Sequence, residues 1–230
     1  MIRICFIMGM LFVIDTFSSL GATDAKFTYN LPGDLEPKSG SGVTDDEIYY
    51  PSLRFPLEGG PAFLNSQVYR PGGSEGGPGG QCSISNYSYP WRDNFCEVRR
   101  WSVPICPGGK GHQGQDIRPA TCKAGVHWAV AALDGVVTNI GRYSVTIQTA
   151  SGTILRYLHL QRSDLAVREL DYVRKGDRIG KVSNEFGGTP TTIHLHFDIK
   201  DTILVRNQPR AMYIPPYSSL VASYKRLIGE

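Results

Sequence analysis

The sequence predicts a mainly β protein: one compact antiparallel β-sheet domain with a flexible N-terminal segment and a short C-terminal helix. From Cys82 onward, short runs of alternating apolar residues are broken by Gly, Asp and Asn, a pattern typical of antiparallel sheets. The stretch before Cys82 is rich in Gly, Pro, Ser and Asp, and helical spacing of apolar residues appears near the C-terminus. A chain of 230 residues with 41% hydrophobic content suits one domain plus an accessory segment.

The N-terminus has the order of a secretory signal peptide. Arg3 precedes an apolar run from Ile4 to Ile14, and small residues follow between Ser18 and Ala22. The run is too short to span a bilayer, which needs roughly 20 apolar residues. We therefore expect residues 1–22 to be removed on export, which leaves a chain without stable membrane insertion.

Residues 23–81 are predicted to be a low-complexity linker arm. Its end, residues 70–80, is dominated by Gly and Pro, and such a stretch cannot repay the entropy of ordering. Apolar residues between Asp45 and Val68 leave open the alternative that part of the arm packs on the domain.

Signal removal takes away Cys5 and leaves Cys82, Cys96, Cys106 and Cys122. An even set of cysteines in an exported chain predicts disulfides, and three pairings are possible. A zinc–cysteine cluster is disfavoured because no two cysteines are closely spaced. Disulfides form in an oxidising compartment, so the favoured location is the periplasm of a Gram-negative bacterium.

Turn signals and alternation place several strands and one helix in the second half of the chain. The predicted strands are Val126–Leu133, Val136–Ile140, Val145–Thr149, Thr153–Leu160, Arg178–Val182 and Thr192–Ile199. Residues 206–230 form a C-terminal extension, in which Pro215 and Pro216 open a helix with Leu220, Tyr224 and Leu227 at helical spacing.

The segment from Thr192 to Ile199 holds the strongest chemical pattern. Side chains alternate across a strand, so Thr192, His194, His196 and Asp198 share one face while apolar residues line the other. A polar row facing solvent is the simpler interpretation, but His112 and Asp116 add an imidazole and a carboxylate at short spacing. These groups suit Zn²⁺, and a catalytic zinc site uses three protein ligands. His112, Asp116 and one of the two strand histidines would complete such a set.

A fourth histidine, His159, lies near the end of a predicted strand, with Tyr157 expected on the same face. A half-buried histidine satisfied by a backbone carbonyl is the alternative interpretation. His127 has no metal-like neighbour in sequence and is assigned to packing.

Four segments, in this order, resemble the lysostaphin/LytM-type zinc metallopeptidases. They are His112-x-x-x-Asp116, Tyr157–Leu160, Val173–Gly180 and His194-x-His196-Phe197. The resemblance covers about residues 112–200. It implies a fold of the duplicated hybrid motif type with a long open groove, and a zinc metallopeptidase domain over residues 82–205.

The same resemblance implies roles for individual side chains. One zinc ion per chain is held by His112, Asp116 and His196. His194 and His159 are left as the unligated catalytic pair, with His194 as general base and His159 hydrogen-bonded to the developing oxyanion. Tyr157 either assists His159 or packs.

The activity implied is that of a zinc-dependent endopeptidase hydrolysing peptide bonds in peptidoglycan cross-links or stems. Two alternatives remain: a non-catalytic peptidoglycan-binding activator of a cell-wall amidase, and a protease acting on glycine-rich proteins. Every expected ligand position is filled here, which favours an enzyme. Peptidoglycan is the expected partner and the chain is expected to act as a monomer. A formal charge of +3 without basic runs or a nucleic-acid-binding motif predicts no nucleic-acid partner.

The sequence departs from the family pattern in two places. A cysteine-containing segment, Arg118 to Gly125, is inserted after Asp116, and Trp91 to Trp101 replaces the usual Gly-Arg-rich start. Neither departure removes an expected ligand, but both are placed to reshape the groove.

Overall fold

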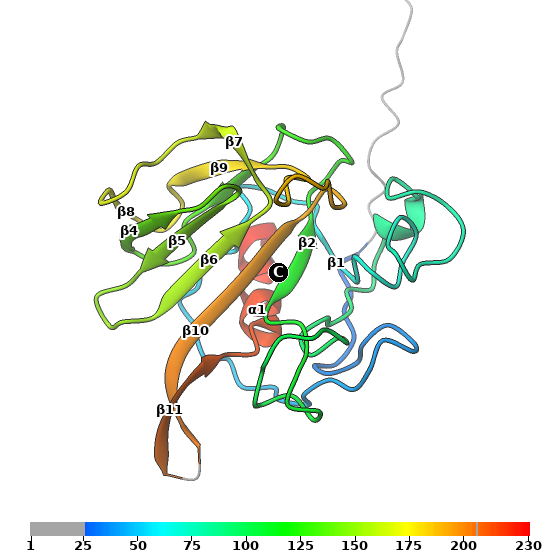
Figure 1. The fold of residues 1–230 in the computed structure, drawn as a ribbon, viewed down its shortest axis with the longest axis horizontal. Helices are drawn as coiled ribbons and strands as arrows, with labels where there is room; N and C mark the ends of the chain where they lie inside the picture. Colours follow the sequence, from blue (N-terminus) through cyan, green and yellow to red (C-terminus); the bar gives the residue numbers. More distant parts are fainter. Residues whose placement is uncertain (1–25, 206) are drawn as a thin grey trace, which may run out of the picture.

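The structure, a computed structural model, describes residues 26–205 and 207–230 (Figure 1). The predicted signal peptide lies outside the described residues. The strands are β1 (Phe63–Leu64), β2 (Gln115–Arg118), β3 (Trp128–Val130), β4 (Gly135–Ile140), β5 (Ser144–Gln148), β6 (Ile154–Leu158), β7 (Leu160–Leu165), β8 (Tyr172–Val173), β9 (Arg178–Val182), β10 (Leu195–Val205) and β11 (Gln208–Tyr213). A 3-10 turn, η1 (Ile84–Asn86), and one α-helix, α1 (Tyr217–Ile228), accompany them. Within these residues, no helix has the length and apolar character needed to cross a membrane.

Two antiparallel sheets form the domain. The larger has the order β1-β2-β10-β6-β5-β4-β8, and β11 extends β10 as a hairpin. The smaller has the order β3-β9-β7. The predicted fold class, mainly β with antiparallel pairing and one C-terminal helix, is confirmed.

The predicted strand boundaries hold at β9 and change elsewhere. The expected strand Thr153–Leu160 is split, because His159 adopts a φ of 64° and turns the chain out of β6. The chain continues into β7, which pairs in the smaller sheet. The expected strand Thr192–Ile199 starts later, at Leu195, and continues to Val205, because its far half pairs with β11. The expected strand Val126–Leu133 shortens to β3.

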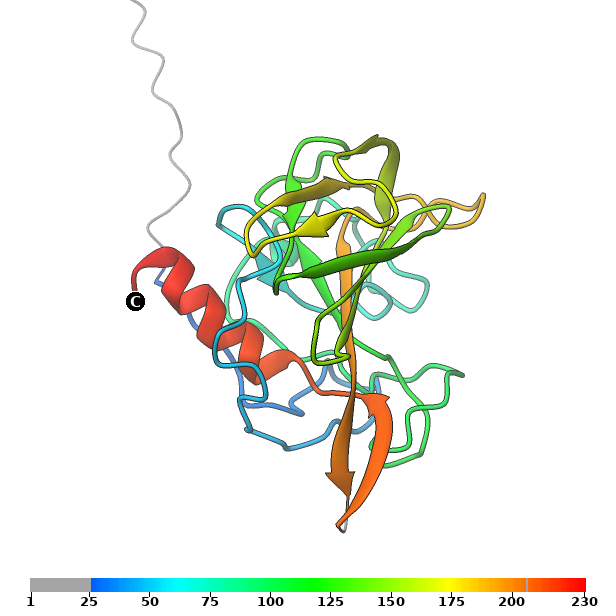
Figure 2. The ribbon, with the colours of Figure 1, turned by 90° about the vertical axis from the view of Figure 1, so that its left-hand side faces the viewer.

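One hydrophobic core joins both sheets and the helix. Alternating side chains of β2, β6 and β10, such as Ile117, Leu155 and Phe197, are fully buried in it. Figure 2 shows α1 and the smaller sheet on the same side of the larger sheet. The helix contributes Leu220 and Tyr224 to this core, in agreement with the helical spacing of the sequence.

The segment expected to be a linker arm also supplies core residues. Leu53, Phe55, Leu57 and Leu64 are at most 1% exposed and belong to the same cluster as the sheets. The backbone of this segment bonds to the domain as well, since Glu58 N donates to the Trp128 carbonyl. For these residues, apolar burial outweighs the turn-rich composition that suggested a free linker.

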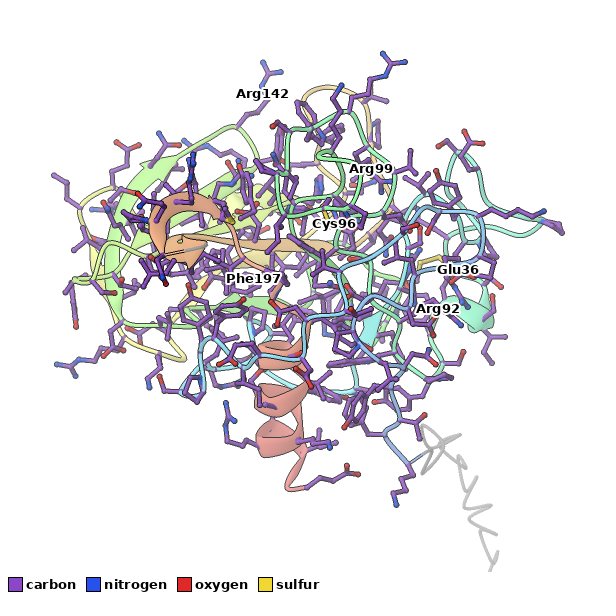
Figure 3. The ribbon with its side chains drawn as sticks, turned by 90° about the horizontal axis from the view of Figure 1, so that it is seen from below. Glu36, Arg92, Cys96, Arg99, Arg142 and Phe197 are labelled. Carbon is purple, nitrogen blue, oxygen red and sulfur yellow. A yellow bond between two sulfur atoms is a disulfide. The ribbon has the colours of Figure 1, made fainter. Side chains whose placement is uncertain are left out.

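Polar contacts fasten the more N-terminal part of the arm. Arg92 forms ion pairs with Asp34 and Glu36, at nitrogen–oxygen distances of 2.8 and 3.7 Å (Figure 3). The glycine-rich stretch is also folded on itself, with Gly73 N donating to the Arg70 carbonyl.

The four cysteines form two disulfides, Cys82–Cys122 and Cys96–Cys106. Of the three pairings that the sequence allowed, the structure has this one. Cys82–Cys122 joins the end of the N-terminal arm to the loop that follows β2, whereas Cys96–Cys106 closes a loop that precedes β2.

Candidate metal centre

His112, Asp116 and His196 converge at one point. Asp116 in β2 lies directly opposite His196 in the antiparallel pair β2–β10. Asp116 Oδ1 lies 3.3 Å from His112 Nε2 and 3.1 Å from His196 Nδ1, and the two ring nitrogens are 2.9 Å apart. All three side chains are buried.

In both His112 and His196, the ring nitrogen that points away from Asp116, here called the outer nitrogen, faces a hydrogen-bond acceptor. His112 Nδ1 lies 2.9 Å from the Asn94 carbonyl, and His196 Nε2 lies 3.1 Å from Asp198 Oδ2. Because a carbonyl or carboxylate accepts, each outer nitrogen carries the hydrogen. His112 Nε2 and His196 Nδ1 are therefore the nitrogens available to a metal ion, an arrangement common among metal-ligating histidines.

The convergent atoms fit zinc. A tetrahedral zinc ion with bonds of about 2.0–2.1 Å separates its ligand atoms by about 3.3 Å, and the three separations here are 2.9 to 3.3 Å. In the metal-free protein, a proton on His196 Nδ1 can be shared with His112 Nε2 at 2.9 Å and with Asp116 Oδ1 at 3.1 Å, in the place that a cation would take. His112, Asp116 and His196 thus form a group of two imidazoles and a carboxylate that could hold a metal ion.

Asn94 and the Cys96–Cys106 disulfide position the His112 side of the centre. Asn94 Oδ1 accepts a hydrogen bond from Asp116 N at 3.1 Å, and the Asn94 carbonyl accepts one from the His112 ring. Asn94 therefore contacts two of the three converging residues. His112 also exchanges backbone hydrogen bonds with Cys96 and Glu97, which the Cys96–Cys106 disulfide anchors.

Gly114 explains the spacing between His112 and Asp116. A Cβ atom at this position would lie 2.3 Å from the Phe197 carbonyl oxygen, so only glycine lets the loop approach β10 so closely.

His194 and His159 lie beside the converging atoms, with their ring centroids 4.4 Å apart. His194 Nδ1 donates to the Thr192 carbonyl at 2.8 Å, and His159 Nδ1 donates to the Glu185 carbonyl at 2.9 Å. The Nε2 atom is therefore the free, basic nitrogen in the neutral form of both rings. His194 Nε2 lies 3.4 Å from Asp116 Oδ1.

Ser183 supports both of these histidines. Its Oγ donates to the His159 carbonyl at 2.9 Å, and its own carbonyl accepts from His194 N at 3.3 Å. Ser183 is 2% exposed, so this contact lies inside the domain next to the end of β9.

Burial and neighbouring charges shift the pKa values of the site histidines in different directions. Burial lowers the pKa of His194, and burial together with the nearby His194 lowers the pKa of His159 well below its usual range. Burial alone would also lower the pKa of His196, but the carboxylates of Asp116 and Asp198 raise it to about 9. The imidazoles of His112 and His194 hold the pKa of Asp116 well below its usual range, although burial opposes this.

Tyr157 does not share the face of His159. Its ring is fully buried in the core, and its hydroxyl accepts from Ala132 N at 2.8 Å. The left-handed backbone of His159 breaks the alternation and turns the imidazole toward the centre. Of the two sequence alternatives for Tyr157, packing is the one that the structure shows. His127 lies apart and bonds to Thr121 Oγ1 at 2.7 Å.

The centre opens into a groove of about 530 Å³. Two arginines, Arg99 and Arg156, line it, and Asp116 is the single acidic residue among the described residues that do so. The remaining lining residues are Gln67, Val68, Trp101, His112, Gln113, Tyr143, Leu158, His159, Phe186, Thr191, His194, His196 and Tyr213. Tyr143 stacks on His159 with an interplanar angle of 4°.

Several contributors to this centre were missed by sequence reasoning: Asn94, Ser183, Arg156 and the groove aromatics. Asp198 was placed on the histidine face of the strand but given no role. Its position two residues after His196 was the available signal, because alternation puts the pair side by side. Arg156 holds Asp198 in turn, with Nη2 2.7 Å from Oδ2.

Comparison with known proteins agrees with this geometry. Residues 110–209 match the family model described as Peptidase family M23. No curated protein matches the chain.

Solved structures similar to this chain are distant. A candidate glycyl-glycine endopeptidase LytM from Ruminococcus gnavus is 21% identical, covering 77% of this chain and 63% of its own, with a TM-score of 0.43. A candidate peptidase M23 from Pseudomonas aeruginosa is 18% identical, covering 86% and 55%, with a TM-score of 0.41. The catalytic domain of lysostaphin from Staphylococcus simulans is 21% identical, covering 60% and 95%, also at 0.41. The chain thus spans less than two thirds of the first two of these proteins.

Proposed function

Because residues 110–209 match the model of Peptidase family M23, we propose that the chain is a zinc-dependent endopeptidase that hydrolyses peptide bonds in peptidoglycan. The observation that carries the proposal is the convergence of His112, Asp116 and His196 beside two histidines whose Nε2 atoms are free. A binding module that only activates another hydrolase has no need of this arrangement.

His112 Nε2, Asp116 Oδ1 and His196 Nδ1 would hold the ion. Zinc in this position supplies Lewis acidity, which polarises a peptide carbonyl and lowers the pKa of a water molecule. Asn94 and Asp198 keep the two ligand rings in the tautomer that exposes the correct nitrogen.

His194 is the proposed general base. Its Nδ1 hydrogen is fixed on the Thr192 carbonyl, and burial lowers its pKa, so the ring is neutral near pH 7 and Nε2 can accept a proton from the attacking water. The resulting imidazolium can then donate that proton to the leaving amine.

His159 is the second proposed catalytic histidine. The family resemblance implied a hydrogen-bond donor to the oxyanion, but the neutral ring donates through Nδ1 to the Glu185 carbonyl and presents a bare Nε2. His159 can therefore donate to the substrate only after it has accepted a proton. Its stacking on Tyr143 holds the ring at the groove wall meanwhile.

The groove favours an anionic, extended substrate. Arg99 and Arg156 are held in place by the buried carboxylates of Glu97 and Asp198, so their guanidinium groups are ordered before a ligand arrives. With a zinc ion bound, the lining carries an excess of positive charge. Peptidoglycan stem peptides, which bear free carboxylates, fit this surface.

Two disulfides among the described residues support a location in an oxidising compartment. We propose the periplasm of a Gram-negative bacterium, reached through the predicted signal peptide. A monomer suffices, since the described chain supplies every proposed ligand.

The test is digestion of purified sacculi by the mature, zinc-loaded protein, with released fragments identified by mass spectrometry. We expect cleaved cross-links or stems, loss of cleavage with a chelator, and no cleavage by Asp116→Ala. If the zinc-loaded protein binds sacculi but cleaves neither sacculi nor other peptides offered as substrates, the chain is a non-catalytic activator instead. Cleavage of glycine-rich proteins but not sacculi would favour the third alternative.

A further inference from the structure

Gln81 holds the short segment that carries His194. Its side-chain Oε1 accepts from the backbone nitrogen of Ile193 at 2.7 Å. The preceding residue, Thr192, accepts the Nδ1 hydrogen of His194 on its carbonyl, and its hydroxyl bonds to Gln67. The backbone that fixes the tautomer of His194 is therefore fastened at two adjacent residues.

Gln81 is itself anchored to β2. Its carbonyl accepts from Asn86 Nδ2 at 3.1 Å and from Arg118 Nη1 at 3.3 Å. Arg118 is fully buried at the end of β2, two residues after Asp116. These bonds connect the strand that carries Asp116 with the segment that carries His194.

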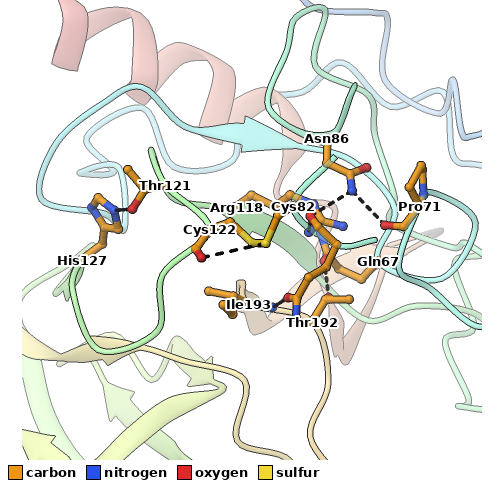
Figure 4. The surroundings of a disulfide bond; sticks show 11 residues. Gln67, Pro71, Cys82, Asn86, Arg118, Thr121, Cys122, His127, Thr192 and Ile193 are labelled. Carbon is orange, nitrogen blue, oxygen red and sulfur yellow. Dashed lines mark hydrogen bonds between the residues drawn. A yellow bond between two sulfur atoms is a disulfide. The ribbon is translucent and has the colours of Figure 1, made fainter. Parts of the chain in front are cut away.

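The Cys82–Cys122 disulfide closes the same connection covalently. Cys82 follows Gln81, and Cys122 lies four residues after Arg118. Figure 4 shows the two sulfurs beside Arg118, with Thr192 and Ile193 gathered on the other side. Neither the disulfide nor Gln81 lines the groove, so their contact with the chemistry is indirect.

We propose that Gln81 is a positioning residue for His194, and that the Cys82–Cys122 disulfide locks Gln81 in place. The inference rests on the proposed function, and it assigns a different role to each of the two disulfides. Cys96–Cys106 supports the segment that pairs with the ligand His112, whereas Cys82–Cys122 supports the unligated base.

A matched set of variants tests Gln81. Gln81→Ala removes the acceptor for Ile193 N, and we expect kcat on a cross-linked peptide to fall on the order of tenfold with KM and zinc content unchanged. Gln81→Glu keeps an oxygen at this position and is expected to restore most of the rate. Gln148→Ala, an exposed glutamine on β5, is the control and should match the wild type. An unchanged kcat in Gln81→Ala, or a rate lost in step with zinc, overturns the proposal.

The disulfides provide a second, independent comparison. Cys82→Ser/Cys122→Ser should reproduce the Gln81→Ala phenotype, with full zinc content and lowered kcat. Cys96→Ser/Cys106→Ser should weaken zinc binding instead. If both pairs affect zinc and rate alike, the assignment of different roles to the two disulfides is wrong.

A readout that does not need activity separates this inference from the proposed function. In zinc-loaded protein labelled with ¹⁵N-histidine, His194 should show the Nδ1–H tautomer in the wild type and in Gln81→Glu. In Gln81→Ala we expect exchange between tautomers. If the wild type cleaves no peptidoglycan, the proposed function fails, and an unchanged His194 spectrum in Gln81→Ala would still reject the positioning role.

Discussion

Each of the four histidines at the centre uses one ring nitrogen for an internal hydrogen bond and leaves the other facing the groove or its neighbours. His112 and His196 lie against Asp116, while His194 and His159 present Nε2. The side chains are chemically the same, so their roles follow from which nitrogen is anchored and from the distance to the carboxylate.

Variants of the two strand histidines should separate metal binding from proton transfer. His196→Ala removes one of three ligands, and we expect loss of both zinc and activity. His194→Ala should keep zinc and lose roughly 10²–10⁴-fold in kcat, because it lacks only the base. His159→Ala should resemble His194→Ala. Zinc analysis of the purified variants checks this, and metal loss in His194→Ala with retention in His196→Ala would reverse the assignment.

Zinc binding should also release a proton. In the metal-free protein, the pKa of His196 is about 9, so this ring is protonated at pH 7 and must lose its proton to bind zinc. We expect about one proton released per zinc at pH 7, and an affinity that rises about tenfold per pH unit up to about pH 9. Calorimetry in buffers of different ionisation enthalpy measures the release; none at pH 7 would contradict the protonation state.

At the scale of the element, the corner between β6 and β7 does the most for the site. The strand alternation buries Tyr157 and would send His159 to the same face, but the φ of 64° at His159 redirects its ring to the groove. Because His159 has a left-handed backbone, Tyr157 points into the core while His159, two residues later, points into the groove.

Tyr157→Phe tests this separation. Removing the hydroxyl leaves Ala132 N without its acceptor, which should lower the free energy of unfolding by about 1–3 kcal/mol. The rate should be unchanged, because the ring does not reach the groove. Denaturant unfolding and kcat measured on the same preparation check both expectations. A tenfold loss of kcat at full zinc content would show that Tyr157 takes part in catalysis.

At the scale of the whole molecule, the N-terminal arm and α1 share an aromatic cluster behind the larger sheet. Trp91 lies 4.7 Å from Phe27, 5.7 Å from Phe55 and 4.4 Å from Tyr224, measured between ring centroids. Segments from both ends of the described chain thus contribute to one core.

Truncation in the arm should therefore destabilise the domain. Phe55→Ala removes a fully buried ring and is expected to cost about 3–5 kcal/mol of unfolding free energy. Leu31→Ala, at a position 77% exposed in the same arm, should change stability by less than about 0.5 kcal/mol. Chemical denaturation compares the two, and equal effects would show that the arm does not pack as described.

The fold class could be predicted from alternation, and alternation with local spacing pointed to His112, Asp116 and one of the two strand histidines. The choice of His196 over His194 came from the resemblance to the lysostaphin/LytM-type family. The roles of Asn94 and Ser183 could not, since each acts through its backbone or across contacts between segments distant in sequence. The packing of Phe55 stayed one of two alternatives for a similar reason: composition averaged over the arm favoured a linker, and the partners of its few apolar residues lie far along the chain. Disulfide pairing likewise depends on tertiary proximity.

The contrast between two tryptophans gives the protein its own optical probes. Trp91 is fully buried in the aromatic cluster, whereas Trp101 is 60% exposed and lines the groove. Emission from Trp91 reports whether the arm and the helix are docked, and emission from Trp101 responds when a ligand excludes water from the groove. With Trp91→Phe and Trp101→Phe to separate these two signals from the emission of Trp128, the fluorescence of the unlabelled protein follows substrate occupancy and folding in one cuvette.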